Sequence, residues 1–401
     1  MIKILWIVLI IASISLVTWL ALLFGRGRFW AMDETLIPPE EDEAISSWPS
    51  ICAIIPARNE SDILPETLPT VLNQNYPGRI RVVLVDDNSE DGTGDIAREL
   101  ARESDSESEF EAVKPPPTPD GWTGKVWALQ QGFGKAKEDD CQLIWLTDAD
   151  ISHHPGTAKT LTNKLVDEGL DLVSIMADLQ TETFWEKLLI PNFVYYFSML
   201  FPFEWVNNSN RNTAAAAGGC ILVRKSALAG AGGFSSFQDA IIDDCALARE
   251  IKKEGRNLWL GLSHMAESIR SYGSLNAIWK TISRSAFSQL NHSLLLLLGT
   301  IIGMLLLFVV PTGVVAFGLA GTVIPIAGMG GTLATGIAAV GGITWLIMAY
   351  SFFPILRWYG LSQTYGLLAP LGGVLYTLMT IDSAIDWWTG KGGNWKGRRY
   401  S

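Results

Sequence analysis

The sequence carries three short clusters of acidic and polar side chains, each directly after a short apolar run. They are Pro56-Ala57-Arg58-Asn59-Glu60 after Ile51 to Ile55, Asp86-Asp87-Asn88-Ser89 after Arg81 to Val85, and Asp148-Ala149-Asp150 after Leu143 to Leu146. Each cluster alone also suits a turn or a helix cap, where Asp and Asn are common. Together the carboxylates repel one another unless a cation or ligand compensates. A divalent metal bound to phosphate groups is the natural compensator, because oxygen ligands suit Mg²⁺ or Mn²⁺.

The segments before these clusters determine whether the clusters meet. Beyond those three runs, further strands are predicted at Phe110 to Val113 and Leu172 to Ile175, with helices over about 62–73 and 92–103. Short apolar strands that alternate with helices predict an α/β domain, with a mostly parallel sheet covered by helices on both faces. Ligands bind such sheets beyond the carboxyl ends of the strands. We therefore expect the three clusters to face one cleft.

Two details of this cleft suit a diphosphate. Asp148 and Asp150 are two residues apart, so an extended backbone would point both side chains the same way. Gly121-Trp122-Thr123-Gly124-Lys125 opens a helix that continues through Gln130. A lysine at a helix N-terminus, beside free N–H groups and the positive end of the helix dipole, suits a diphosphate. An ordinary surface lysine would give the same pattern.

The first apolar tract, Ile2 to Phe24, predicts an N-terminal transmembrane anchor over residues 1–25. Its only charge is Lys3. It is longer than the apolar region of a signal peptide, and no small-residue cleavage site follows it. Arg26 and Arg28 come directly after the tract. By the positive-inside rule the next domain lies in the cytoplasm, so we expect a multi-pass protein of the cell (inner) membrane.

The second apolar tract lies within 290–388 and predicts several C-terminal spans. The candidates are Ser293 to Phe317, Leu333 to Phe353 and Leu367 to Trp388. Three spans would leave the basic tail 389–401 on the outer side, against the positive-inside rule. Either a fourth span lies in Val310 to Met329, or the last segment lies in the membrane interface.

Between the tracts we expect a linker over 26–48 and a catalytic domain over 49–285. Within the domain, 183–205 is rich in aromatic residues but contains Pro191 and Pro202. This composition favours a helix at the membrane interface, and a buried core helix is the alternative. The net charge of −11 argues against nucleic acid as a partner. A transporter or scaffold is disfavoured because Ser293 to Phe353 carries no charge to mark a substrate path.

The clusters, together with Gly124-Lys125-Val126-Trp127-Ala128-Leu129 and Trp395-Lys396-Gly397-Arg398, resemble the family 2 glycosyltransferases with a GT-A fold. The fuller match resembles the hopene-associated glycosyltransferases, whose relatives include ceramide glucosyltransferases. The resemblance covers essentially the whole chain. It implies transfer of a sugar from a nucleotide-diphosphate donor, with UDP as the expected nucleotide, to a hydroxyl of a membrane lipid, such as a hopanoid or another isoprenoid or glycolipid.

The resemblance also implies roles for individual residues on the donor side. Part of the nucleotide pocket would be formed by the first cluster, through Pro56, Ala57, Arg58 and Glu60. Asp86 would read the uracil ring, with Asp87 as its neighbour. Asp150 would bind the metal, Mg²⁺ or Mn²⁺, and Asp148 would contact the ribose or support the metal.

On the acceptor side, Asp244 matches the family's catalytic base. The residue before it is Asp243, where many members carry Glu, and such a pair is also an ordinary helix-start pattern. Gly218 and Gly219 resemble the acceptor loops. Arg284 is a candidate diphosphate contact, and the surrounding sequence departs from the Gln-x-x-Arg-Trp motif of processive synthases. A polyprenyl-phosphate acceptor is the alternative, and it would need no strong base.

Overall fold

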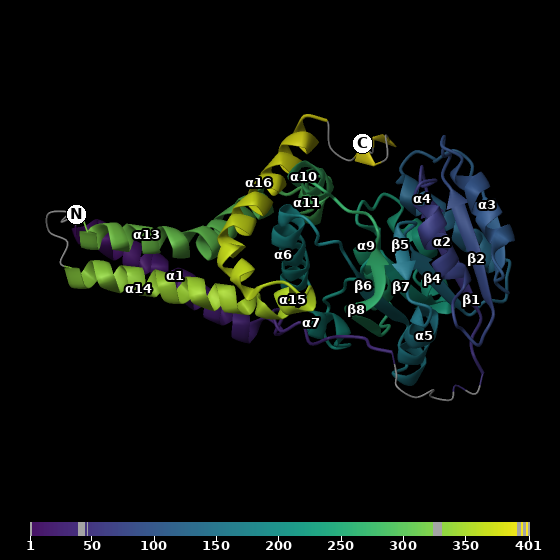
Figure 1. Ribbon diagram of the computed structural model, residues 1–401, viewed down its shortest axis with the longest axis horizontal. Helices are drawn as coiled ribbons and strands as arrows, with labels where there is room; N and C mark the ends of the chain where they lie inside the picture. Colours follow the sequence, from purple (N-terminus) through teal and green to yellow (C-terminus); the bar gives the residue numbers. More distant parts are fainter. Residues whose placement is uncertain are drawn as a thin grey trace.

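The computed structural model describes residues 2–38, 45, 47–323, 331–390, 394–395 and 398–399. Figure 1 shows an α/β layer at one end, long helices that point away from it at the other, and a group of helices between the two. Most of the predicted basic tail, including Lys396 and Gly397 of the terminal motif, lies outside the described residues, as does part of the predicted linker.

Eight strands form one sheet in the order β3-β2-β1-β4-β7-β6-β8-β5. They are β1 (Ile51–Ala57), β2 (Ile80–Asp86), β3 (Glu109–Val113), β4 (Leu143–Thr147), β5 (Ile151–His153), β6 (Leu172–Asp178), β7 (Cys220–Arg224) and β8 (Leu258–Ser268). The pairs β1–β2, β1–β4, β2–β3 and β6–β8 are parallel. β7 is antiparallel to both β4 and β6, and β5 is antiparallel to β8. The predicted α/β class is confirmed; β5, β7 and β8 were not predicted.

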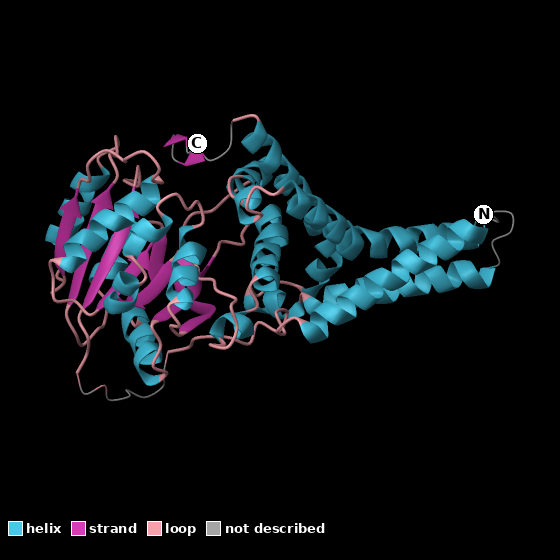
Figure 2. Ribbon diagram, turned by 180° about the vertical axis from the view of Figure 1, so that it is seen from behind, coloured by secondary structure: helices cyan, strands magenta, loops and turns pink. Residues whose placement is uncertain are grey.

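Helices cover both faces of this sheet, as Figure 2 shows. They are α2 (Leu64–Leu72), α3 (Thr93–Glu103), α4 (Gly124–Lys137), α5 (Thr157–Asp167), α8 (Lys225–Gly230), the 3-10 helix η1 (Gly233–Phe237) and α9 (Asp243–Lys253). Successive residues of β1 belong to opposite cores: Ala53 packs with Leu68 of α2, and Ile54 packs with Phe133 of α4. This alternation follows from the two-residue period of a strand, and it explains why every residue of β1 is apolar and buried.

A second layer of helices lies between the sheet and the long helices. It contains α6 (Phe184–Leu200), α7 (Phe203–Asn207), α10 (Leu275–Ser283), α11 (Ala286–Gln289), α15 (Phe353–Trp358), the 3-10 helix η3 (Gln363–Leu368) and α16 (Ala369–Trp388). We predicted α6 as an interfacial helix. Its central residues are buried in a core that also contains residues of α15 and α16. α6 therefore has the burial that the alternative of a core helix predicts, and its place at a membrane interface stays a prediction.

The remaining helices are long and apolar. They are α1 (Ile2–Gly25), α12 (Leu294–Met304), the π-helical turn η2 (Leu305–Val309), α13 (Val310–Val323) and α14 (Gly331–Ser351), and two short strands follow at β9 (Asn394–Trp395) and β10 (Arg398–Arg399). Within the part of the chain that the structure describes, four helical stretches are long and apolar enough to cross a membrane: Lys3–Gly25, Leu294–Thr322, Thr332–Trp358 and Gln363–Trp388. One N-terminal and three C-terminal candidates therefore stand where the sequence predicted membrane helices.

The π-helical turn η2 shows how this apolar region satisfies its backbone. A π turn disturbs the regular hydrogen bonding of a helix, and unpaired carbonyl groups are costly in hydrocarbon. The carbonyl of Leu306 accepts a hydrogen bond from the Ser15 hydroxyl, and that of Leu307 accepts one from the Trp19 indole, at 2.7 and 2.9 Å. Both donors lie on α1, so the anchor is tied to the C-terminal helices by polar contacts.

The sequence left open whether a fourth span lies in Val310 to Met329 or the last segment lies in the membrane interface, and the path of the C-terminal helices bears on this choice. Residues 294–322 form one continuous candidate span, so within the described residues Val310–Val323 continues that span and forms no separate one. In Figure 1, α1, α13 and α14 lie side by side in the part farthest from the sheet, whereas α16 runs obliquely and ends on the side of the sheet. The last helix is itself long and apolar enough to cross a membrane, so whether it crosses or lies in the interface stays a prediction.

Candidate active site

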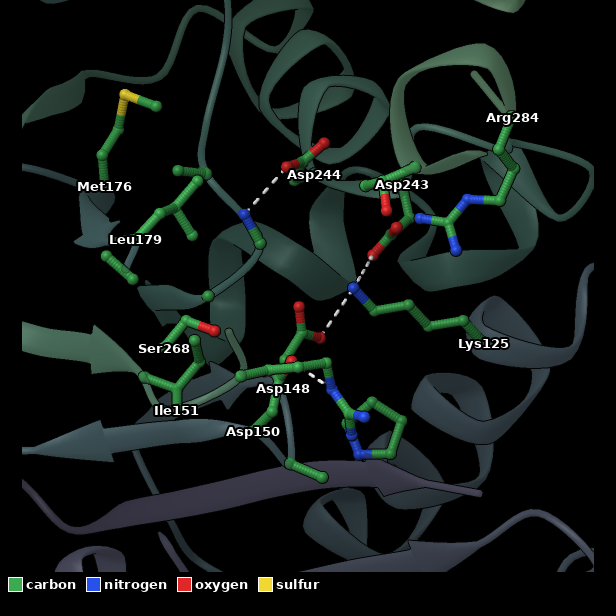
Figure 3. A pocket seen from close by; sticks show the side chains of 18 of the residues that line it. Lys125, Asp148, Asp150, Ile151, Met176, Leu179, Asp243, Asp244, Ser268 and Arg284 are labelled. Carbon is green, nitrogen blue, oxygen red and sulfur yellow. Dashed lines mark hydrogen bonds and ion pairs between the residues drawn. The ribbon is translucent and has the colours of Figure 1, made fainter. Parts of the chain in front are cut away.

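A cavity of about 480 Å³ lies where the carboxyl ends of β1 and β4 meet α6 and the segment after β8. The predicted residues that line it are Pro56, Glu60, Lys125, Asp148, Asp150, Gly218, Gly219, Asp243, Asp244 and Arg284. These residues come from segments spread over more than half of the chain. The fold therefore brings most of the predicted site into one space, shown in Figure 3.

Lys125 joins the two acidic sides of the cavity. Its ammonium nitrogen lies 2.7 Å from a carboxylate oxygen of Asp148 and 3.4 Å from one of Asp243, as Figure 3 shows. Burial opposes the charge on Lys125, but the carboxylates of Asp148 and Asp243 outweigh burial and raise the pKa of the amine. Lys125 is therefore a permanent cation at the start of α4, and the alternative of an ordinary surface lysine does not describe its position.

Asp150 lies beside a second cation. The guanidinium of Arg270 lies 3.5 Å from the Asp150 carboxylate and 2.6 Å from that of Glu60. Burial raises the pKa of Asp150, and the neighbouring charge of Asp148 raises it further. A cation that enters from the open side of the cavity would therefore stabilise the ionised form of the Asp150 carboxylate.

Asp244 lies across the cavity from the Asp148–Asp150 pair, at the start of α9. Its carboxylate accepts hydrogen bonds from the backbone N–H groups of Gly218 at 2.8 Å and Cys245 at 2.7 Å. Burial, together with the charge of Asp243, raises the pKa of Asp244 to about 6. A carboxylate with such a pKa binds a proton more readily than an ordinary one while remaining ionised at neutral pH, which suits a general base.

Gly218 and Gly219 have a steric role at this site. A Cβ atom on Gly218 would lie 3.3 Å from both the Asp244 carboxylate and the Lys125 amine, and one on Gly219 would lie 3.1 Å from Ala177. Both contacts are tight. The absence of side chains therefore lets this loop pass close to the charged groups.

Four of the predicted donor residues do not line the cavity: Ala57, Arg58, Asp86 and Asp87. The Arg58 guanidinium donates a hydrogen bond to the Asp87 carbonyl at 2.6 Å, and Asp86 accepts one from the Ser89 backbone at 3.0 Å. A Cβ on Gly94 would lie 2.7 Å from the Asp86 carboxylate, so the start of α3 must come close to this aspartate. These four residues lie at the carboxyl ends of β1 and β2, outside the cavity lining. Their role in recognition of the nucleotide base stays a prediction.

The opposite wall of the cavity is apolar. Met176 and Leu179 at the end of β6, Phe193 and Phe197 of α6, and Ile241 line it. The sequence had singled out the aromatic residues of α6, but not their place beside the charged groups. On this side the cavity borders α6, which packs against α15 and α16.

Arg270 and Tyr272 were missed by the sequence analysis, although both line the cavity. Their signal was their position just after a strand, and that strand, β8, was not predicted. Glu186 of α6 holds this segment in place. Its buried carboxylate accepts hydrogen bonds from the backbone N–H groups of Tyr272 at 2.7 Å and Gly273 at 3.1 Å, and from the Ser271 hydroxyl at 2.8 Å.

The residues present fit a divalent metal that is held mainly by its substrate. Among the described residues no group of three or more His, Cys, Asp or Glu side chains forms a metal cage. Asp148 and Asp150 supply carboxylate oxygens, and their present partners are the cations Lys125 and Arg270. Mg²⁺ in particular is commonly bound by one or two carboxylates plus substrate phosphates, so this pair is consistent with a metal that arrives with a diphosphate.

Comparison with known proteins agrees with this geometry. Residues 52–230 match the family described as Glycosyl transferase family 2. A probable glycosyltransferase of Bacillus subtilis (strain 168), YdaM, is 34% identical over 145 residues, covering 34% of this chain and 32% of that protein. An undecaprenyl-phosphate 4-deoxy-4-formamido-L-arabinose transferase of Pseudomonas syringae pv. syringae (strain B728a) is 29% identical over 139 residues, covering 34% and 38%. The matched region thus spans about a third of the length of these relatives.

Among solved structures, the mannosyltransferase PcManGT from Pyrobaculum calidifontis, in complex with GDP-Man and Mn²⁺, superposes with a TM-score of 0.56. The superposition covers 93% of this chain and 99% of that chain, at 19% sequence identity. At this identity the likeness establishes the fold, including the helices that follow the sheet, and leaves the substrates open.

Proposed function

We propose that this chain, in which residues 52–230 match the family described as Glycosyl transferase family 2, transfers a sugar from a nucleotide-diphosphate donor to a hydroxyl group of a membrane lipid. We further propose that UDP is the nucleotide, that the reaction inverts the anomeric configuration, and that a hopanoid or another isoprenoid or glycolipid is the acceptor.

The observation that carries this proposal is the position and basicity of Asp244. This buried carboxylate has a pKa raised to about 6 and lines the same cavity as Asp148, Asp150 and Lys125. A base that faces a diphosphate-binding edge across one cavity is the arrangement that a single displacement requires. In such a displacement no side chain has to form a covalent intermediate with the sugar.

In the proposed reaction, Asp244 takes the proton of the acceptor hydroxyl as the oxygen attacks the anomeric carbon. The new carbon–oxygen bond forms as the bond to the donor diphosphate breaks, so the configuration inverts. Negative charge then grows on the leaving nucleoside diphosphate. Lys125 can stabilise this charge because its amine is a permanent cation at the N-terminus of α4.

Asp150, with support from Asp148, would hold a divalent metal, Mg²⁺ or Mn²⁺. When bound, the metal would neutralise charge on the diphosphate. Arg270 would then exchange its contact with Asp150 for one with the substrate, because the same carboxylate serves both cations. Arg284 lines the same cavity and is a further candidate contact for the diphosphate.

A lipid hydroxyl is favoured over a lipid phosphate as the acceptor. The acceptor side combines the apolar wall of α6 with the carboxylates of Asp243 and Asp244. A phosphate acceptor would bring negative charge against this pair, whereas a hydroxyl gives up a proton to it. The relative from Pseudomonas syringae carries undecaprenyl phosphate in its name, so the phosphate acceptor is the comparison that an experiment must include.

The proposed setting is the inner face of the cell membrane. Arg26 and Arg28 come directly after α1 in the sequence, and Figure 1 shows that the C-terminal end of α1 is the end nearer the sheet. Positive residues at this end favour a cytoplasmic catalytic domain, where nucleotide sugars would be the soluble substrate and the lipid bilayer would present the acceptor.

The test is a product assay with the purified full-length chain in lipid nanodiscs. A panel of nucleotide sugars is supplied with Mg²⁺ or Mn²⁺, and separate samples contain a total lipid extract or undecaprenyl phosphate. We expect an inverted glycoside of a hydroxyl lipid, formed only with metal. A glycosyl phosphate as the sole product, or a glycoside with retained configuration, would overturn the proposal.

A further inference from the structure

A second cavity, of about 520 Å³, lies at the junction between the long helices and the sheet layer. It is bordered by the segment after α1, the end of α14, α15 and one residue of β8. In Figure 1, α15 lies at the base of α1 and α14, on the side of the sheet. If these helices cross a membrane, the cavity lies at the level of the lipid headgroups.

The lining of this cavity combines aromatic rings with nitrogen groups. The aromatic rings are those of Trp30, Tyr350, Phe353 and Trp358. Arg357 adds a guanidinium group, and His264 adds an imidazole. The rings of Trp30 and Tyr350 are 6.1 Å apart, and those of Tyr350 and Phe353 are 5.4 Å apart. Tryptophan and tyrosine are enriched where membrane proteins meet the headgroups.

The two nitrogen-bearing side chains differ in their partners. His264 bonds through Nδ1 to the Asp178 carboxylate and stacks on Trp358 at 3.9 Å. Arg357 is exposed, and within the described residues its guanidinium has no hydrogen bond or ion pair. An unpaired guanidinium beside a pocket has donors placed for an anion, and its planar fork matches phosphate.

The cavity is separate from the candidate active site. Ala177 and Leu179 line the catalytic cavity. The residue between them, Asp178, instead accepts a hydrogen bond from the Trp358 indole at 2.9 Å. The two cavities therefore lie on opposite sides of one segment, and none of the described residues that line the second one carries a carboxylate.

An apolar surface continues from this cavity along the long helices. Phe24 at the end of α1 is 83% exposed, and Leu346 and Tyr350 of α14 are 62% and 59% exposed. Side chains of this kind are stable in contact with acyl chains and unfavourable in water. A ligand with an anionic head and apolar tails matches both the cavity and its surroundings.

We propose that this cavity binds one anionic phospholipid, with its phosphate at Arg357, its headgroup between the aromatic rings, and its acyl chains along α1 and α14. The site is distinct from the acceptor site and does not depend on the transferase reaction. Its occupant is a membrane lipid, because a soluble phosphate ester would leave the apolar surface uncovered.

The test is native mass spectrometry of the purified full-length protein in detergent, titrated with phosphatidylglycerol or with phosphatidylcholine of the same acyl chains. We expect one tightly retained phosphatidylglycerol and weaker retention of phosphatidylcholine. Arg357→Gln should weaken phosphatidylglycerol binding about tenfold, the effect of losing a charge-assisted hydrogen bond.

The matched control is Arg28→Gln. Arg28 lies near the same end of α1, but it is paired with Asp33 at 2.8 Å in an exposed ion pair and does not line the cavity. We expect less than about a twofold change, because an exposed pair contributes little. Equal losses in the two variants would overturn the proposal in favour of diffuse surface charge. Unchanged binding in Arg357→Gln, equal retention of the two lipids, or equally tight binding of soluble glycerol 3-phosphate would also overturn it.

Discussion

The donor half and the acceptor half of the catalytic cavity are built in different ways. The donor half consists of side chains that directly follow β1 and β4 or open α4, and its carboxylates are matched by Lys125 and Arg270. The acceptor half is assembled from α6, the segment after β8 and the start of α9. It combines the apolar wall of α6 with the carboxylates of Asp243 and Asp244, and the segment after β8 adds Tyr272 and the Arg270 guanidinium that reaches the donor carboxylates.

The two halves differ in the neighbours of their buried carboxylates. Burial raises the pKa of both Asp150 and Asp244, but the Arg270 guanidinium lies 3.5 Å from Asp150 and opposes this rise, whereas the charge of Asp243 adds to the effect of burial and raises the pKa of Asp244 to about 6. The proposed metal ligand thus lies beside a cation, and the proposed base lies beside a second carboxylate. The variants below test each half in turn.

The largest expected effect lies in the donor half. Asp150→Asn should abolish transfer and should weaken donor binding only when metal is present, because its proposed role is to join metal to diphosphate. Calorimetric donor titrations with and without EDTA measure this. Asp95→Asn in α3, whose side chain is 89% exposed, is the control and should leave binding unchanged. A metal response in Asp150→Asn as large as in the wild type would refute the role.

The next largest effect concerns the acceptor half. Asp244→Asn should keep the fold and donor binding, yet lower the transfer rate by about 10²–10⁴, the usual contribution of a general base. Asp243→Asn should be milder, because adjacent residues at a helix start lie about 100° apart and only one can point at the acceptor. Lipid product formed per unit time is the readout. If Asp243→Asn proved the more damaging variant, the two roles would have to be exchanged.

Lys125→Ala tests whether the donor half acts on the transition state. We expect turnover to fall by about 10² with a smaller loss of donor affinity, because charge on the leaving diphosphate grows as the bond breaks. Steady-state kinetics beside donor calorimetry separate the two quantities. Lys135→Ala, near the other end of α4, removes the same charge away from the cavity. Equal losses in turnover and affinity would mean that Lys125 binds ground state and transition state alike.

The smallest expected effect comes from Glu186, which holds the segment after β8 against α6. Glu186→Gln replaces an acceptor of three hydrogen bonds around Tyr272 with a group that is partly a donor, so we expect a loss of about 1–3 kcal/mol in stability. We also expect the KM for the acceptor to rise about tenfold, because a loss of about 1.4 kcal/mol in binding free energy corresponds to this factor. Glu182→Gln, at an exposed position on the same loop, is the control.

The stability difference of Glu186→Gln should depend on pH. Burial opposes ionisation of Glu186, but hydrogen bonds from Thr183, Ser271 and Gly273 lower its pKa to about 2 from an ordinary 4.5. A lowered carboxyl pKa stabilises the fold above 4.5 and loses this effect as the pH falls toward 2. Melting temperatures of the two proteins should therefore converge over this range. A constant difference would show that hydrogen bonding to the ionised carboxylate is not the cause.

The two halves also differ in how far the sequence predicts them. The strands before the donor clusters are short apolar runs followed by polar residues, so periodicity and position sufficed to place Asp148, Asp150 and Lys125 together. The acceptor half depends on β7 and β8, and β8 carries polar residues such as Ser263 and His264 that obscure its strand pattern. Arg270 and Tyr272 were missed for this reason, because their position relative to a strand was unknown.

The helix α6 shows a second limit of the sequence. Its many aromatic residues suited either a membrane interface or a core, since composition alone does not reveal what covers a helix. The structure covers it with α15 and α16, which lie more than 150 residues away in the chain. The roles of Arg58, Asp86 and Asp87 in nucleotide recognition remain predictions, since they lie beside the cavity without lining it.

The most direct test of the central claim is the pH dependence of a single turnover, measured in nanodiscs with saturating donor and a hydroxyl-lipid acceptor. Because the base must be ionised to accept a proton, and the pKa of Asp244 is about 6, the wild-type rate should be level above pH 7. It should fall about tenfold per unit below pH 6. Asp244→Asn should be slow and should lack this acid limb. A wild-type rate that stays constant from pH 5 to pH 7, or an acid limb that persists in Asp244→Asn, would contradict the assignment of Asp244 as the base.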